Sequence, residues 1–402
     1  MKRILYVLVA LLICSVASAQ EATTKGNSSD KVAELEARLA KNEARVASWE
    51  KAKQYFKITG FMQSQYEWKA DGNGGTDVST FSIRRVRFSM TGDLYKGKKG
   101  AKIDYRLYFD LARIKLPNPN PILDMWVRYQ PVKEFGVQFG QFKNPITFEA
   151  SISPAKYEFI DFSYAVCNLA KMGSNDVAGL NVTARDAGFQ FFGGFVHRDG
   201  YSVINYNVGV LNGNGINEKD NNKSKDIYGK ITIKPTANLA LATFYQWGEA
   251  NLAKFKSEEE IRGEYGWNGN PEYVTMHRWG IGFKYDGDGP YARGEYIAGT
   301  TGQLVSEGAY LAGGYKIKLP KNAGRIWTGA MVDYFCRNCF DYIHRDTANA
   351  VIDTRYSICL AYEPIKYFHF QVAYSLEQRI NYTFANGRNF GNGVKLMATV
   401  MF

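Results

Sequence analysis

The feature that most constrains this chain is a two-residue alternation of apolar and polar side chains from Phe56 onward. It runs in segments of about ten residues separated by clusters of Gly, Asn and Asp, which is typical of antiparallel strands and their turns. The apolar faces of three segments comprise Phe368, Phe370, Val372, Tyr374 and Leu376; Val394, Leu396, Ala398, Val400 and Phe402; and Leu123, Met125, Val127 and Tyr129. A soluble β-sandwich alternates as well, so the alternation alone does not choose between sandwich and barrel.

Three further features favour a barrel that crosses a membrane. Short connections such as Gln130–Glu134 and Asp286–Gly289 are interspersed with long ones such as Lys143–Arg185, as in outer-membrane barrels. Aromatic residues gather at strand ends, where the membrane interfaces would lie. The chain stops at Phe402, on the apolar face of its last segment, which resembles the assembly signal of outer-membrane barrels.

The sequence therefore predicts an all-β transmembrane antiparallel barrel of about 16 strands, wide enough for an aqueous channel. A further strand at Val177–Thr183 would make 18 strands possible. The sixteen predicted strands are 56–68, 79–94, 101–113, 121–130, 135–142, 186–196, 201–211, 226–234, 238–248, 275–285, 290–299, 308–318, 325–335, 352–362, 366–377 and 392–402.

The segments before the barrel indicate export and a helix. Residues 1–19 combine a basic start, an apolar run and a small-residue cleavage site, which predicts a cleaved signal peptide. Residues 20–30 form a polar linker. Residues 31–53 lack Gly and Pro and hold apolar residues at heptad spacing for three heptads, which fits either a coiled coil or a solvated amphipathic helix in the periplasm.

Charged residues collect on the polar faces, which would line the lumen. An excess of cations there favours anion passage, whereas pairing of Arg with Asp across neighbouring strands would only stabilise the wall. The predicted lumen cations are Arg85, Arg87, Arg106, Arg128, Lys230, Arg278, Lys284, Arg293, Lys316, Arg355 and Lys395. The predicted lumen carboxylates are Asp104, Asp110, Asp124, Glu295, Asp333 and Asp353.

The connection 143–185 is too apolar for a loop in water. It could fold inward and narrow the pore, with Lys143, Lys156 and Lys171 as candidate constriction charges, or it could pack over the rim or against another subunit.

Several strands, above all Arg84-Arg85-x-Arg87 and Gly140-Gln141-Phe142-Lys143-x-Pro145, resemble the phosphate-selective porin O and P family. The resemblance implies a trimeric outer-membrane channel of 16 strands, often with an N-terminal coiled coil, whose basic lumen guides phosphate or related anions such as polyphosphate. Arg85 and Arg87 match the family's basic strand. Lys143 matches the residue that leads into its inward loop.

Other classes of function have weaker signals. The chain contains no Gly-x-Ser-x-Gly or His-Glu-x-x-His motif, so we expect neither catalysis nor a cofactor. Its cations are spread over many strands, which argues against nucleic acid as a partner. The Cys336-x-x-Cys339 pair with His344 could bind a metal, form a disulfide or remain as thiols. A plugged structural barrel, anchored through residues 31–53 to the cell wall or to a periplasmic partner, is the main alternative to a channel.

Overall fold

The computed structural model describes residues 28–70, 77–113, 120–173, 176–179, 183–339, 350–381 and 389–402. The chain divides into two compact units, Met1–Gln54 and Tyr55–Phe402. The predicted signal peptide and most of the predicted linker lie outside the described residues. Within the described part, no helix is both long enough and apolar enough to cross a membrane.

The N-terminal helix α2 spans Ser28–Tyr55, close to the predicted range of 31–53. Residues with high helix propensity fill it, and the Glu34–Arg38 ion pair of 2.7 Å joins successive turns. Leu35, Leu39 and Val46, which occupy the heptad positions, are exposed in the single chain.

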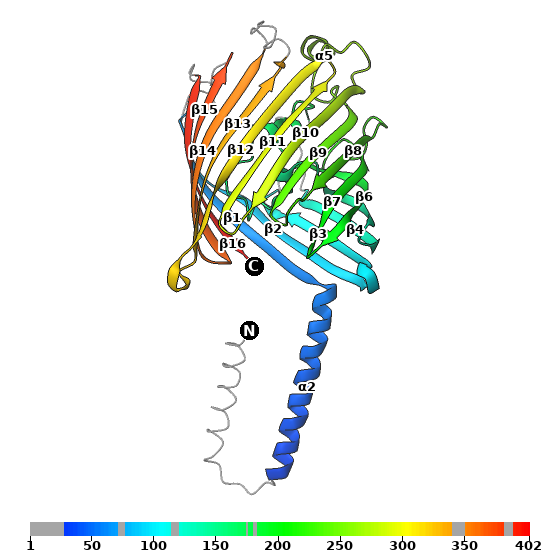
Figure 1. The fold of residues 1–402 in the computed structure, drawn as a ribbon, viewed down its shortest axis with the longest axis vertical. Helices are drawn as coiled ribbons and strands as arrows, with labels where there is room; N and C mark the ends of the chain where they lie inside the picture. The colour runs from blue at the N-terminus through cyan, green and yellow to red at the C-terminus, as the bar shows by residue number, and fades with distance from the viewer. Residues whose placement is uncertain are drawn as a thin grey trace. The chain divides into compact units, whose positions relative to one another are not determined.

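Sixteen antiparallel strands from the described residues close into one barrel, in which each strand pairs with its sequence neighbours and β1 pairs with β16 (Figure 1). The first eight are β1 (Lys57–Lys69), β2 (Val78–Lys96), β3 (Lys102–Asp110), β4 (Ile122–Val132), β5 (Phe135–Lys143), β6 (Arg185–Arg198), β7 (Tyr201–Leu211) and β8 (Asp226–Ile233). The others are β9 (Leu239–Ala250), β10 (Val274–Asp286), β11 (Pro290–Thr301), β12 (Leu304–Lys318), β13 (Arg325–Arg337), β14 (Val351–Ile365), β15 (Phe368–Ile380) and β16 (Phe390–Met401).

Short helices occupy the connections. They are α3 (Phe148–Ser151), α4 (Tyr164–Leu169), α5 (Glu258–Tyr265) and the 3-10 turns η1 (Lys98–Gly100), η2 (Leu111–Arg113) and η3 (Pro320–Asn322). A capping box between Ser257 and Glu260 fixes the start of α5.

The prediction of sixteen strands is confirmed, and the alternative of eighteen is wrong. The sheet closes with sixteen strands, Val177 and Ala178 lie in a turn, and residues 180–182 lie outside the described part. The strand predicted at 101–113 ends at Asp110, where the chain turns into η2.

The two faces of the strands differ as alternation predicts, except at local irregularities of the pairing. In β15, Phe370 and Tyr374 are exposed, whereas His369 and Gln371 are buried. Leu123 was predicted on the outer face but is completely buried inside. The pairing of β3 with β4 shifts by one residue at this position, so Leu123 turns inward beside Asp124.

Candidate functional site

A bulge in β2 brings consecutive arginines to the inner face of the barrel. Gln63 pairs with Arg85 and Ser64 pairs with Ile83, so Arg84 is the extra residue of the bulge. Arg84 reaches Asp161 at 2.8 Å, and Arg85 donates to the Gln63 side chain at 2.9 Å. Together with Arg87, three cations of one strand therefore face inward.

The connection from β5 to β6 lies inside the barrel where the structure describes it, at residues 144–173, 176–179 and 183–184, and we refer to these residues as the inner loop. Its backbone carbonyls accept hydrogen bonds from strands far apart around the wall. Lys230 of β8 donates to Pro145 at 2.7 Å, Arg355 of β14 donates to Phe162 at 2.6 Å, and Gln371 of β15 donates to Tyr157 at 3.1 Å. The inner loop therefore crosses the lumen.

Two carboxylates of the inner loop form ion pairs with the wall. Glu158 lies 2.7 Å from Arg293 and 3.1 Å from Lys316. Asp161 lies 2.8 Å from Arg84 and 2.6 Å from Lys395. Burial alone would raise the pKa of both acids, but these cations outweigh it and hold each pKa below its ordinary value.

Wall carboxylates in turn hold the first turns of the short helices in the inner loop. Glu295 of β11 accepts from the backbone N–H groups of Phe148 and Glu149 at 2.7 and 3.0 Å. Asp333 of β13 accepts from the N–H of Tyr164 at 2.9 Å. These N–H groups have no partner within a helix, so the carboxylates stabilise both helix starts.

The apolar residues of the inner loop pack against the wall. Tyr157, Phe159 and Phe162 are buried in one cluster with wall residues such as Tyr310 and Met331. This burial explains why the connection is apolar, since each such side chain gains about 1.5–3 kcal/mol when it leaves water.

Many of the predicted lumen cations form hydrogen bonds or ion pairs within the protein. Besides Lys230 and Arg355, Arg278 donates to backbone carbonyls at the end of its own hairpin and to Thr301. Lys171 pairs with Asp226 at 2.6 Å, which together with Asp186 raises the pKa of Lys171 against the lowering effect of burial. Lys156 is exposed.

Pairing across neighbouring strands, the alternative to anion passage, is also present. Arg128 binds Asp104 through two hydrogen bonds of 2.8 and 2.6 Å, and Arg87 binds Asp110 at 2.7 Å. These pairs neutralise part of the basic wall without removing its excess of charge.

A hollow of about 230 Å³ remains between the inner loop and the wall. Its charged residues are Arg106, Lys143, Arg185 and Asp124. Asp124 lies 2.6 Å from Arg185 and 3.4 Å from Arg106, and Lys143 donates to the carbonyl of Ala150. The hollow thus holds three cations and one carboxylate, and the carboxylate pairs with two of the cations.

More cations lie beside the hollow. Within the part of the chain that the structure describes, Arg85 and Arg113 have no carboxylate at ion-pair distance. Burial lowers the pKa of Arg113; Asp110 opposes that shift, and Arg87 and Arg185 add to it. We call the following residues the basic cluster: Arg85, Arg87, Arg106, Arg113, Lys143 and Arg185. Only Asp110 and Asp124 pair with members of the cluster among the described residues.

The ring of Tyr108 lies among the arginines of the basic cluster. The guanidinium carbons of Arg106, Arg185 and Arg87 lie 4.3, 5.7 and 5.9 Å from the ring centroid. Cation–π attraction at these distances helps to hold the arginine side chains in place.

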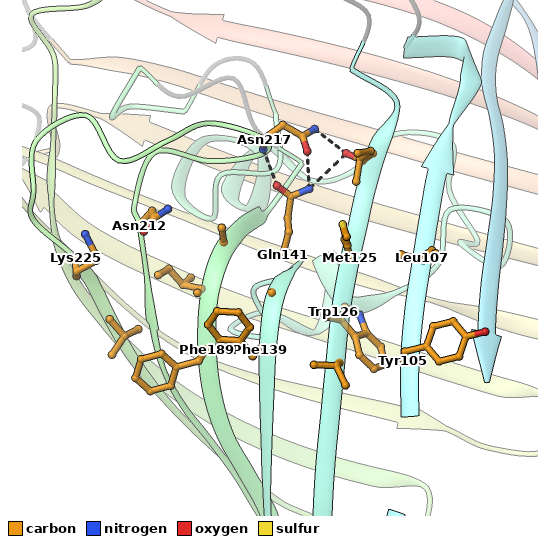
Figure 2. A pocket seen from close by; sticks show the side chains of 17 residues that line it. Tyr105, Leu107, Met125, Trp126, Phe139, Gln141, Phe189, Asn212, Asn217 and Lys225 are labelled. Atoms are coloured by element: carbon orange, nitrogen blue, oxygen red, sulfur yellow. Dashed lines mark hydrogen bonds between the residues drawn. The ribbon is translucent and has the colours of Figure 1, made fainter. Parts of the chain in front are cut away.

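The outer wall carries a different hollow, of about 780 Å³, over β3 to β7 (Figure 2). Exposed Met125, Val127 and Phe139 line it, on the strand face opposite the lumen. At one end of this hollow, Asn217 and Gln141 exchange hydrogen bonds of 2.6 and 3.0 Å. It belongs to the apolar outer surface and not to the lumen.

The thiols give no metal site within the described residues, where no three potential ligands come together. Cys167, Cys336, Cys339 and Cys359 are free, and His344 lies outside the described part.

The sequence interpretation missed Arg84, Arg113 and Arg185 as inward cations. Strict alternation places Arg84 on the lipid face, and a charge predicted there was itself a signal of a bulge. Arg113 was assigned to the end of a strand, and Arg185 to the end of a loop.

Comparison with known proteins agrees with this geometry. The model of the family described as phosphate-selective porin O and P matches residues 56–255. No curated protein sequence matches the chain. The chain is similar to an anion-selective porin from Comamonas acidovorans, with a TM-score of 0.60 and 9% identity, covering 86% of this chain and 99% of that one. It is also similar to OmpT of Vibrio cholerae in its trimer form, with a TM-score of 0.58 and 11% identity, covering 86% and 99% of the two chains. OprB of Pseudomonas putida has a TM-score of 0.57 and 11% identity, covering 88% of this chain and 96% of that one.

Proposed function

Residues 56–255 belong to the phosphate-selective porin O and P family, which makes the chain an outer-membrane porin, and on that premise we propose that it passes small anions in preference to cations. The basic cluster would attract the anions, and the inner loop would narrow their path. Export through a cleaved signal peptide at residues 1–19 is part of the proposal.

The observation that carries this proposal is the excess of cations in the basic cluster. Six basic side chains converge where the inner loop leaves the wall uncovered, and two carboxylates pair with them. Low-dielectric walls focus such a field, so cations are repelled and anions are concentrated at the basic cluster. Guanidinium groups also bind oxyanions through paired hydrogen bonds.

The test is the reversal potential of single channels under a KCl gradient. We expect the wild type to favour chloride. Arg85→Gln with Arg113→Gln should lower the chloride-to-potassium permeability ratio by at least about twofold, because this pair has no carboxylate to leave unpaired. Phosphate added to the same bilayer tests whether phosphate competes with chloride.

The matched control is Lys318→Gln with Lys321→Gln, which removes the same two charges from exposed side chains at a turn. It should leave the ratio unchanged. Equal reversal potentials in the double arginine variant and the wild type would remove the basic cluster from the selectivity of the channel.

A plugged barrel is the second candidate, since the inner loop fills much of the lumen. Ala155 of this loop also packs with Ile216, Phe61 and Leu123 beside the hollow. A plugged barrel would give no conductance in the same bilayer, whereas a weakly selective porin would conduct without preference for chloride.

We further propose a homotrimer in which α2 forms a parallel coiled coil. The exposed seam of Leu35, Leu39 and Val46 supports this assembly, with Asn42 at one core position to fix the register. The trimer form of OmpT gives a precedent in a similar fold.

A further inference from the structure

We infer that the solutes favoured at the basic cluster are small amphipathic anions, in which a carboxylate is attached to an apolar body, in preference to fully hydrophilic oxyanions. This inference rests on the proposed anion channel and names the class of solute that its narrowest site selects.

The hollow has two chemically different sides. The wall supplies the cations Arg106, Lys143 and Arg185 together with Asp124. The inner loop supplies apolar Pro145, Ile152 and Pro154, with the hydroxyls of Ser151 and Ser153 between them. A volume of about 230 Å³ exceeds what an inorganic phosphate needs, because such an ion is roughly as large as two or three waters of about 30 Å³ each. Part of the remaining space borders apolar side chains.

Some hydrogen-bond donors in the hollow are already committed to the protein. Arg185 uses Nε on Asp124 and one terminal nitrogen on Thr183, and Arg106 uses Nε on Ser89. Lys143 commits one proton to the carbonyl of Ala150. The terminal nitrogens that remain can pair with both oxygens of a carboxylate. A phosphate carries more charge and more oxygens, so it loses more hydration when it enters beside apolar side chains.

Apolar surface continues beyond the hollow. Tyr108 lines the hollow and also belongs to a buried cluster with Phe61, Leu123, Ala155 and Ile216. An apolar body bound beside the cations would therefore lie against Ile152 on one side and the ring of Tyr108 on the other. Chloride and phosphate gain nothing from these contacts, since neither carries an apolar body.

The experiment measures bi-ionic potentials of the full-length protein with potassium chloride, acetate, benzoate and phosphate. Benzoate is larger than acetate and diffuses more slowly in water, so an unselective pore passes it less readily. We expect the opposite order here, with benzoate above acetate and phosphate below both. Benzyl alcohol, a neutral molecule of similar size, should not block the current.

The variant Ile152→Thr isolates the apolar side of the hollow. It should lower the benzoate-to-acetate permeability ratio severalfold, while Ile152→Val, which keeps an apolar surface, should lower it less. The experiment distinguishes a failure of the proposed function from a failure of the further inference. Absence of chloride preference in KCl would overturn the proposed function. Chloride preference with a benzoate-to-acetate ratio that follows aqueous mobility, or that Ile152→Thr does not change, would overturn the inference alone.

Discussion

At the scale of single residues, backbone irregularities determine which side chains reach the lumen. The bulge at Arg84 turns two adjacent arginines inward, and the register shift at Leu123 buries a leucine that alternation assigns to lipid. Gly140, in the Gly-Gln-Phe-Lys element of β5, is a third irregularity, with φ of +122°. Its missing side chain lets β5 pass close to β4, immediately before Lys143.

Gly140→Ala should therefore destabilise the barrel by roughly 1–3 kcal/mol. A Cβ at this position would lie 2.2 Å from the carbonyl oxygen of Met125 and 2.9 Å from the Cα of Trp126, in a backbone conformation that alanine rarely adopts. Urea unfolding of the refolded barrel measures the change in free energy. The matched control is Gly229→Ala in β8, where nothing lies within 4 Å of the new Cβ, so its change should stay within about 0.5 kcal/mol. Equal stabilities of the two variants would contradict this account of Gly140.

At the scale of elements, the inner loop is fixed by partners on many strands instead of by regular structure of its own. Its ion pairs, its capped helix starts and its aromatic residues each contact a different part of the wall. The loop also forms hydrogen bonds and ion pairs with wall cations that would otherwise face the solute. The position of one connection therefore decides which cations of the wall are already paired.

Asp161→Asn should loosen the inner loop, because Arg84 and Lys395 both lose a carboxylate partner. We expect greater open-channel current noise and faster cleavage of the loop by protease. Asp288→Asn, at an exposed turn, should change neither quantity. Current noise and a rate of cleavage equal to those of the wild type would show that the aromatic contacts alone hold the loop in place.

The pH dependence follows from the lowered pKa of Asp161. An acid with a depressed pKa in the folded state stabilises that state fully above its unfolded pKa, near 3.9, and loses the contribution as the pH falls through the folded value. The contribution of Asp161 should thus be retained from pH 7 to about pH 5. The difference in current noise between Asp161→Asn and the wild type should therefore stay constant over that range, and a difference that disappears between pH 6 and 5 would contradict this account of Asp161.

At the scale of the whole molecule, the chain consists of two compact units, one with the helix and one with the barrel. The barrel closes by strand pairing within residues 57–401, while α2 belongs to the other compact unit. We therefore expect changes in the helical seam to alter association of the chains without altering the fold of the barrel.

Leu35→Ser with Leu39→Ser should weaken the proposed trimer, since two apolar core positions of a short coiled coil are lost. Chemical cross-linking in detergent measures the trimer fraction, and circular dichroism monitors the strands. Glu36→Ser with Glu43→Ser, outside the seam, provides the control. An unchanged trimer fraction in the leucine variant would mean that barrel contacts hold the assembly without the helix.

The sequence by itself determined the strands, their number and the face that most side chains occupy. Alternation is a local property with a period of two, and the contrast between lipid and lumen imposes it on every strand, so the predicted and observed bounds agree closely. It also indicated part of the basic cluster, namely Arg85, Arg87, Arg106 and Lys143.

Only the tertiary structure decided which cations remain open to a solute. Lys230 and Arg355 are held by inner-loop carbonyls, Arg128 is held by Asp104, and Arg185 joins the cluster from the far end of the loop. These outcomes depend on contacts between residues far apart in the chain and on one-residue shifts in register. The periodicity of the sequence contains neither the long-range contacts nor the register shifts. The electrostatic effect of a charge depends on its distance to other charges, and the closed barrel with its inner loop sets those distances.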